Sequence, residues 1–393
     1  MNTIYMDHHA TTPLDSDVLD AMLPFLKGNF ANPASQHASG NDVSKAVEQA
    51  RSEIASSINT DPRSIIFTSG ATESNNLAIH GVAAFYKEQG NHIITCKTEH
   101  PAVLDPCASL EKEGYEISRL AVDQYGMIDL DELRDAITDK TILISLMFAN
   151  NEIGTIQDIK SIGDIAKEHK VFFHCDAAQA FGKIPIDLDL LGIDLMSISA
   201  HKIYGPKGIG ALYLRRRNPR VRLEAMQLGG GHERGFRSGT LNVPGIIGFA
   251  KASEVAMMSM TQDSVHISKM RNHMQKSIMD SLDNVYLNGH PDRRLPGNLN
   301  LSFEDIDGYS LLAKLNGIDM SMGAACSSAI SKPSHVLRAI GRSPELCQSG
   351  IRIGLGRANS SDEVDYVAQA IVKAVSELRE SGNSVDRESC VYV

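Results

Sequence analysis

Lys202 stands where a covalent reaction at an amine is possible. It follows the apolar segment 195–199 and precedes a glycine-rich turn, a place where α/β enzymes keep functional groups. A neutral lysine amine attacks carbonyl groups and can hold a cofactor as a Schiff base. Ser199 and His201 beside it can bind phosphate. Most lysines are solvated surface residues, so this segment alone leaves both interpretations open.

Asp176 directly follows a second apolar segment, 171–175. A carboxylate at the end of a buried strand is costly unless it is paired. One interpretation is the N-cap of a helix that begins at Ala177. The other is a partner for the protonated ring nitrogen of pyridoxal phosphate, which makes the ring an electron sink. Gln179 is then close enough to reach the ring hydroxyl.

Two further segments suit a phosphorylated ring. Residues 68–75 pass from a strand through a glycine turn into a helix, whose first N–H groups can bind phosphate with help from the hydroxyl of Thr72. The same pattern is also that of an ordinary capping box. His100 follows another strand end; a lone histidine is more often structural, but an imidazole here can stack on a ring or move protons.

Cys326 lies among small residues in the segment 321–329. A thiol in such a segment is poorly explained as core filling, and a thiolate there would be a nucleophile. Arg352 lies in an apolar strand, where its guanidinium needs a partner. The carboxylate of an amino-acid substrate would fit that planar fork.

Apolar segments alternate with helical patterns, which predicts an α/β protein with a large, mostly parallel sheet. Strands are expected at 64–68, 92–96, 141–147, 171–175, 195–199 and 210–214. After about residue 255 a long helix leads to a strand at 298–303 and a final helix at 363–379, which indicates a smaller α+β domain. We expect a large domain at 15–255, a small domain formed by 1–14 and 256–380, and a tail at 381–393.

Composition excludes several classes of protein. The chain has 393 residues, 42% hydrophobic, and a net charge of −10, which argues against a dedicated nucleic-acid binder. No apolar stretch is long enough for a membrane span, and the first residues do not resemble a signal peptide, so a cytoplasmic location is expected. The six cysteines show no C-x-x-C spacing, so no metal site is expected and most should be reduced and buried.

Taken together, these motifs closely resemble those of the cysteine desulfurases that serve iron–sulfur cluster assembly, in the class-V aminotransferase family. The similarity runs from residue 5 to about residue 375 and rests on the segments 5–13, 150–155, 176–179, 199–202 and the Cys326 loop, in family order. The resemblance implies the fold of aspartate aminotransferases (fold type I) and a homodimer. It also implies pyridoxal 5′-phosphate as cofactor.

The resemblance assigns the cofactor contacts. Lys202 is expected to anchor the cofactor covalently, Asp176 to pair with the ring nitrogen and Gln179 to contact the ring oxygen. His100 is expected to stack on the ring. The phosphate is expected to be bound by Ala71, Thr72, Ser199 and His201 and, from the partner subunit, by Thr240.

The same family removes sulfur from L-cysteine, releases L-alanine and leaves a persulfide on a loop cysteine. By resemblance Asn151 lies beside the ring and the substrate, Arg352 binds the substrate carboxylate, and Cys326 receives the sulfur. The spacing from Cys326 to 333–337 is that of the long-loop group. Three kinds of sulfur acceptor stay open: an iron–sulfur scaffold, a tRNA-thiolation enzyme and a nitrogenase-specific partner.

Three departures from the family pattern stand out: the segment 321–325 is less rich in serine, Gly354 replaces a frequent serine, and the tail 388–393 differs from a scaffold-docking tail. Cys390, in that tail, is expected to be incidental rather than a second sulfur acceptor. An aminotransferase or selenocysteine lyase of the same fold is the nearest alternative function. A sulfur-relay or scaffold protein without turnover is a more distant one.

Overall fold

The computed structural model describes residues 3–323 and 333–382. Its centre is a seven-stranded sheet in which β3, β4, β5, β6 and β7 pair in parallel, while β8 runs antiparallel to both of its neighbours. In spatial order the strands are β2 (Ile65–Thr68), β8 (Gly210–Leu214), β7 (Leu195–Ser199), β6 (Phe172–Asp176), β5 (Thr141–Ser145), β3 (His92–Cys96) and β4 (Glu116–Leu120). The predicted α/β fold with a mostly parallel sheet is confirmed.

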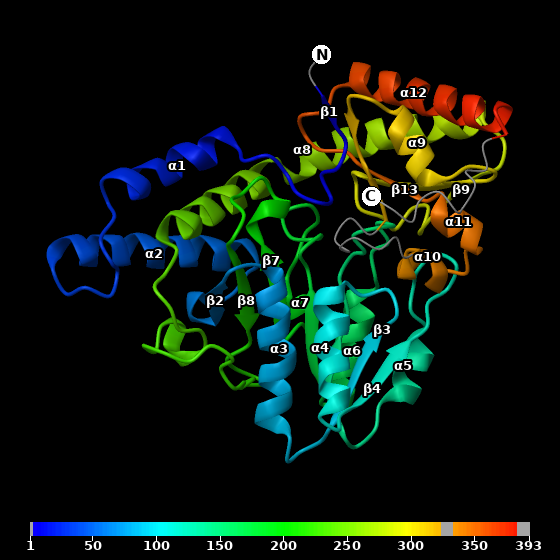
Figure 1. The fold of residues 1–393 in the computed structure, drawn as a ribbon. Coiled ribbons are helices and arrows are strands. Elements are labelled where there is room, and N and C mark those ends of the chain that lie inside the picture. The colour runs from blue at the N-terminus through cyan, green and yellow to red at the C-terminus, as the bar shows by residue number, and fades with distance from the viewer. Residues whose placement is uncertain (1–2, 324–332, 383–393) are drawn as a thin grey trace, which may run out of the picture.

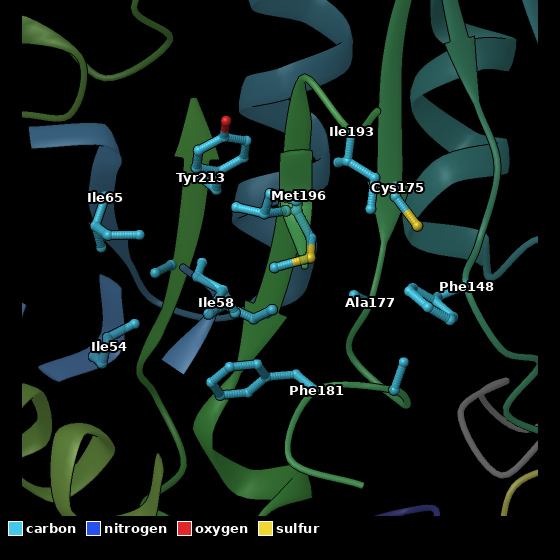
Figure 2. Close-up of a cluster of buried hydrophobic side chains, with 14 of the residues drawn as sticks. Ile54, Ile58, Ile65, Phe148, Cys175, Ala177, Phe181, Ile193, Met196 and Tyr213 are labelled. Carbon is cyan, nitrogen blue, oxygen red and sulfur yellow. The ribbon is translucent and has the colours of Figure 1, made fainter. Parts of the chain in front are cut away.

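Helices cover both faces of this sheet, which is why its inner strands are continuous apolar runs. One face packs against α3 (Ala71–Tyr86) and α4 (Pro101–Lys112) (Figure 1). The other face carries the largest apolar cluster, part of which Figure 2 shows around Met196, Tyr213 and Phe181. This cluster takes side chains from α1 (Ser16–Lys27), α2 (Ala38–Ser57), α5 (Leu130–Ala136), α6 (Ile159–His169), α7 (Leu188–Leu191) and α8 (Val243–Ser281).

A second, smaller sheet is antiparallel throughout. Its order is β12 (Ser321–Met322), β13 (Ile351–Gly354), β10 (Asn298–Phe303) and β9 (Val285–Leu287). A separate apolar core joins it to α9 (Gly308–Lys314) and α12 (Ser361–Glu380). The remaining elements are the parallel pair β1 (Ile4–Tyr5) and β11 (Ile318–Asp319), the helices α10 (His335–Ala339) and α11 (Pro344–Gln348), and the 3₁₀ turns η1 (Pro62–Ser64), η2 (Ala200–Lys202) and η3 (Glu233–Gly235).

The 39-residue helix α8 joins the two cores. Its first half packs on the large sheet through Ile246 and Phe249, and its second half packs under the small sheet through Met274 and Ile278 (Figure 1). The helix is continuous where residue 255 was predicted to separate two domains, and the division of the chain at that residue stays a prediction. Among the described residues no helix has the length and apolarity needed to cross a membrane.

Candidate active site

The candidate residues gather at one edge of the large sheet. Asp176 is the last residue of β6, and Ser199 is the last residue of β7. His100 follows β3, and the turn after β2 leads into α3. Because these strands run in the same direction, their carboxyl ends meet. That edge of an open α/β sheet is where ligands bind.

Lys202 lies in the 3₁₀ turn η2 directly after β7. Its Nζ donates to the carbonyl oxygens of His9 at 2.6 Å and Ala10 at 2.7 Å. The N-terminal segment is held against this turn, since Thr12 Oγ1 donates to the carbonyl of His201 at 2.9 Å. The amine is therefore placed by backbone groups at the sheet edge, within reach of a molecule bound there.

The buried Asp176 carboxylate has hydrogen-bond partners, as its burial requires. It does not act as the N-cap of a helix. Its Oδ2 accepts a 2.6 Å hydrogen bond from Asn75 Nδ2 on α3, and its Oδ1 accepts from the Ala178 N–H at 2.9 Å. The residues after it form turns, so the alternative of a helix beginning at Ala177 is wrong. Only 7% of Asp176 is exposed, and a buried, oriented carboxylate suits a cationic ring nitrogen.

His100 is the N-cap of α4, and its Nδ1 accepts a hydrogen bond from the Ala102 N–H at 3.1 Å. The hydrogen of the neutral ring is therefore on Nε2. Burial lowers the pKa of His100 below its usual 6.5; the charge of Lys202 lowers this pKa further, while that of Asp176 raises it. These interactions place His100, Asp176 and Lys202 around one site, with the imidazole neutral near pH 7.

The turn before α3 is built for an anion. Gly70 has a φ of 152°, and no side chain caps the helix that follows it. A full capping box is therefore absent: Glu73 accepts from the Ser69 N–H at 2.8 Å, but the N-cap is a glycine. The first N–H groups of α3, at Ala71 and Thr72, remain available to a phosphate.

Ser199 lies next to this turn, and His201 follows it in the 3₁₀ turn η2. A Cβ placed on Gly70 would lie 3.9 Å from Ser199 Oγ, so the serine hydroxyl faces the turn. His201 Nδ1 lies 3.1 Å from Thr11 Oγ1, which leaves Nε2 for a phosphate. Burial and the charge of Lys202 lower the pKa of His201 to about 4. It would therefore act as a neutral hydrogen-bond donor.

Arg352, on β13, is only 2% exposed. Its Nη2 donates to Asp7 Oδ1 at 2.9 Å and its Nη1 to the carbonyl oxygen of Asn151 at 3.2 Å. Its Nε is buried and has no partner within the described ranges. The small sheet therefore presents a guanidinium with a spare donor, suited to a second carboxylate.

Two predicted residues lie away from this cluster or outside the description. Thr240 is exposed, two residues before the N-cap of α8, as a residue reaching a partner subunit would have to be. Cys326, like Cys390, falls outside the described residues. Ser321, ahead of Cys326 in the sequence, pairs with Arg352 in the small sheet. The other four cysteines are free and buried, as predicted.

Sequence reasoning missed several residues that support the site. Asn75 donates a hydrogen bond to Asp176. The sequence signal that could have found it is an amide side chain one helical turn after Ala71. Glu99 accepts from the Met147 N–H at 2.6 Å, and burial raises its pKa to about 8. Glu152 Oε2 accepts from Ser334 Oγ at 2.5 Å. No sequence pattern distinguishes these two carboxylates from surface ones.

The arrangement fits pyridoxal phosphate. An amine, a buried carboxylate and an uncapped helix N-terminus converge at one sheet edge, and they match the aldehyde, ring nitrogen and phosphate of that molecule. Gln179 Nε2 donates one hydrogen to the His9 carbonyl at 2.9 Å. Its second amide hydrogen is not used by that bond.

Comparison with known proteins agrees with this geometry. The model of the aminotransferase class-V family matches residues 4–367. Cysteine desulfurase IscS of Neisseria meningitidis serogroup C is 53% identical over 96% of this chain and 93% of that protein. A solved NifS-like protein superposes with a TM-score of 0.89 at 36% identity, covering 95% of this chain and all of the other.

A second solved structure, SspA in complex with cysteine, has a TM-score of 0.80 at 37% identity and covers 91% of this chain and all of the other. The class-V aminotransferases depend on pyridoxal phosphate. The chain therefore belongs to the aminotransferase class-V family, among the cysteine desulfurases of the IscS type.

Proposed function

We propose that this protein is a pyridoxal-phosphate-dependent cysteine desulfurase. It takes sulfur from L-cysteine, releases L-alanine and leaves a persulfide on Cys326. The observation that carries the proposal is that one N-terminal segment contacts both candidate groups: the His9 carbonyl accepts from Lys202 Nζ, and Asp7 accepts from Arg352 Nη2. The similarity to IscS-type proteins over 96% of the chain supports the same reaction.

Lys202 would hold the cofactor at its aldehyde carbon, and Asp176 would face the ring nitrogen. His100 would stack on the ring, while Gln179 contacts the ring oxygen. The phosphate would be bound by Ala71, Thr72, Ser199, His201 and the partner subunit's Thr240. When bound, the cofactor withdraws electrons from the substrate Cα and stabilises the resulting negative charge.

Substrate binding would depend on Arg352 and Asn151. The cysteine carboxylate would take the spare Nε of Arg352 and compete with Asp7 for the guanidinium. Lys202, once released, would take the proton from the substrate Cα at its Nζ. His100, with its hydrogen on Nε2, would contact the substrate side of the ring.

Sulfur transfer would take place at Cys326. Its thiolate attacks the substrate sulfur, so an S–S bond forms while the substrate C–S bond breaks. The electron pair of that bond remains with the carbon skeleton, which takes up protons and leaves as alanine. The persulfide keeps the transferred sulfur in a reversible state.

Further partners follow from the same proposal. A homodimer would bring Thr240 to the partner's phosphate site, and the exposed side chains of Phe30 and Leu228, 81% and 84% exposed, are apolar surface that such an interface would cover. The relative bound to cysteine supports L-cysteine as the substrate. An iron–sulfur scaffold or a tRNA-thiolation enzyme would then accept the sulfur.

Absorbance and product assays test this function. The purified protein loaded with pyridoxal phosphate should be yellow and should release alanine from L-cysteine. Lys202→Ala should lose the absorbance of the covalently held cofactor and the alanine release, whereas Lys160→Ala, on the surface of α6, should keep both. An unchanged spectrum in Lys202→Ala would refute the anchor, and pyruvate formation without alanine would refute the reaction.

A further inference from the structure

Lys183 is a second lysine beside the candidate cofactor site, and the proposed reaction gives it no role. It lies one helical turn after Gln179 in the sequence, in the turns that follow β6. Its Nζ donates to Gln179 Oε1 at 3.0 Å. Gln179 is the residue expected to contact the ring oxygen. Lys183 would therefore act on the ring through Gln179.

The contacts of Gln179 fix the orientation of its amide. Its Nε2 lies 2.9 Å from the carbonyl oxygen of His9, which only accepts hydrogen bonds. The other amide atom must then be the oxygen. That oxygen accepts from Lys183 Nζ and also from His9 Nδ1 at 3.1 Å. With the oxygen occupied, Gln179 has only its second N–H to offer to a ring.

The same His9 carbonyl also accepts from Lys202 Nζ at 2.6 Å. Lys183, Gln179, His9 and Lys202 are therefore joined in one hydrogen-bond network. A change at Lys183 reaches the covalent anchor through two residues. This network is a geometric feature and does not depend on the charge of any member.

Charge gives Lys183 a second effect. It lines a cavity of about 60 Å³ together with Lys202 and apolar side chains that include Met260 and Leu355. The titratable and charged groups around this cavity are His8, His9, Lys202, Tyr204, Asp263 and Arg357, and Arg352 acts from β13. Burial, together with the charges of Lys202 and Arg352, lowers the pKa of Lys183 to about 7. By the same repulsion a protonated Lys183 disfavours positive charge at Lys202.

We infer that Lys183 is a positioning residue for the cofactor ring, which holds the Gln179 amide with its N–H toward the ring oxygen and places a second amine beside Lys202. The inference rests on the proposed function, because it requires the cofactor at this edge of the sheet. No contact between Lys183 and the substrate is implied.

Three variants separate the two effects. Lys183→Met removes both the charge and the donor, Lys183→Gln keeps a donor without the charge, and Lys183→Arg keeps both. Lys160→Met, an exposed lysine that pairs with Asp164 on α6, removes a charge far from the network and serves as control. Each holoenzyme is titrated from acid to alkaline pH by the absorbance of its cofactor, and pyridoxal phosphate affinity is measured on each apoprotein.

In Lys183→Met the pH midpoint of the absorbance change should rise, since the positive charge that Lys183 carries below about pH 7 is lost. Pyridoxal phosphate affinity should fall roughly tenfold, which corresponds to the loss of one well-placed hydrogen bond. Lys183→Gln should show the shifted midpoint with a smaller loss of affinity. Lys160→Met should match the parent protein in midpoint, and Lys183→Arg, which keeps a positive charge, should show no rise.

An unchanged midpoint and affinity in a folded Lys183→Met or Lys183→Gln would overturn the inference. Failure of both variants to fold would also overturn it, because it would assign Lys183 a purely structural role. If the parent protein binds no pyridoxal phosphate, the proposed function itself fails. The two failures are thus distinguished by the spectrum of the parent protein.

Discussion

Asn75 Nδ2 donates to Asp176 Oδ2 across 2.6 Å, and this hydrogen bond joins the helix of the candidate phosphate site to the carboxylate of the candidate ring site. Both residues are buried. The two ends of a bound cofactor would therefore be positioned by one contact between α3 and β6. An asparagine at this place holds the carboxylate without neutralising it.

Replacing Asn75 by alanine should weaken pyridoxal phosphate binding. The loss of a hydrogen bond to a charged group costs about 1.5–3 kcal/mol, so the dissociation constant should rise roughly ten- to hundredfold. Asn76→Ala serves as control, because Asn76 donates only to the Thr72 carbonyl of its own helix. Equal affinities of the two variants, measured by fluorescence titration of the apoproteins, would contradict the role of Asn75.

Arg352→Lys should impair the binding of cysteine rather than of the cofactor. A lysine cannot reproduce the two-pronged contact of a guanidinium with a carboxylate. We expect KM for cysteine to rise at least tenfold, with the cofactor spectrum unchanged. Arg134→Lys, at an exposed pair with Asp131 on α5, should leave KM unaltered. A normal KM in Arg352→Lys would remove Arg352 from the substrate site.

Glu99 should make stability depend on pH. Burial raises its pKa to about 8, whereas a glutamate in an unfolded chain titrates near 4.3. Between these values the folded protein retains a proton that the unfolded chain has released, so the free energy of unfolding falls as pH rises. The decrease contributed by Glu99 should be roughly 3–5 kcal/mol across that window.

Glu99→Gln tests this dependence. The variant should show a smaller fall in the free energy of unfolding from pH 5 to pH 8 than the parent protein does in urea titrations. Glu113 is an exposed residue after α4. In Glu113→Gln the free energy of unfolding should fall with pH as much as it does in the parent protein. A slope in Glu99→Gln equal to that of the parent would mean that Glu99 is ionised in the folded protein.

The ion pair of Arg51 and Glu233 should contribute strongly to stability. Arg51 Nη1 and Nη2 contact the two oxygens of Glu233 at 2.7 Å, and both side chains are nearly inaccessible, at 3% and 1% exposed. Glu233→Gln should lower the free energy of unfolding by about 3–5 kcal/mol, because it removes the buried partner of Arg51 and leaves only the exposed Glu48, 3.2 Å from Arg51 Nε. The double variant Arg51→Met/Glu233→Leu should be less destabilised. A Glu233→Gln variant as stable as the parent would show that the pair is dispensable.

Much of the fold could be predicted because the inner strands are continuous apolar runs. The segments 92–96, 195–199, 210–214 and 298–303 were placed with the bounds of β3, β7, β8 and β10. The strand predicted at 141–147 ends earlier, at Ser145, although the Leu146 N–H still donates to the His174 carbonyl of β6 at 3.1 Å. The strand predicted at 171–175 is shifted by one residue, so Asp176 belongs to β6.

The supporting contacts could not be predicted, since each joins residues far apart in the chain. Nothing near Asn75 in the sequence indicates Asp176, and nothing near Arg352 indicates Asp7. The pKa of Glu99 depends on burial, which a charged residue type does not reveal.

The most direct test of the central claim is mass spectrometry of the holoenzyme after brief exposure to L-cysteine labelled with a heavy sulfur isotope. The peptide that contains Cys326 should gain one labelled sulfur atom, which a reducing agent removes, while alanine is released in equal amount. Cys326→Ser should keep the yellow cofactor but gain no sulfur and release little alanine. Full alanine release by Cys326→Ser, or labelled sulfur on another cysteine such as Cys390 instead, would contradict the account.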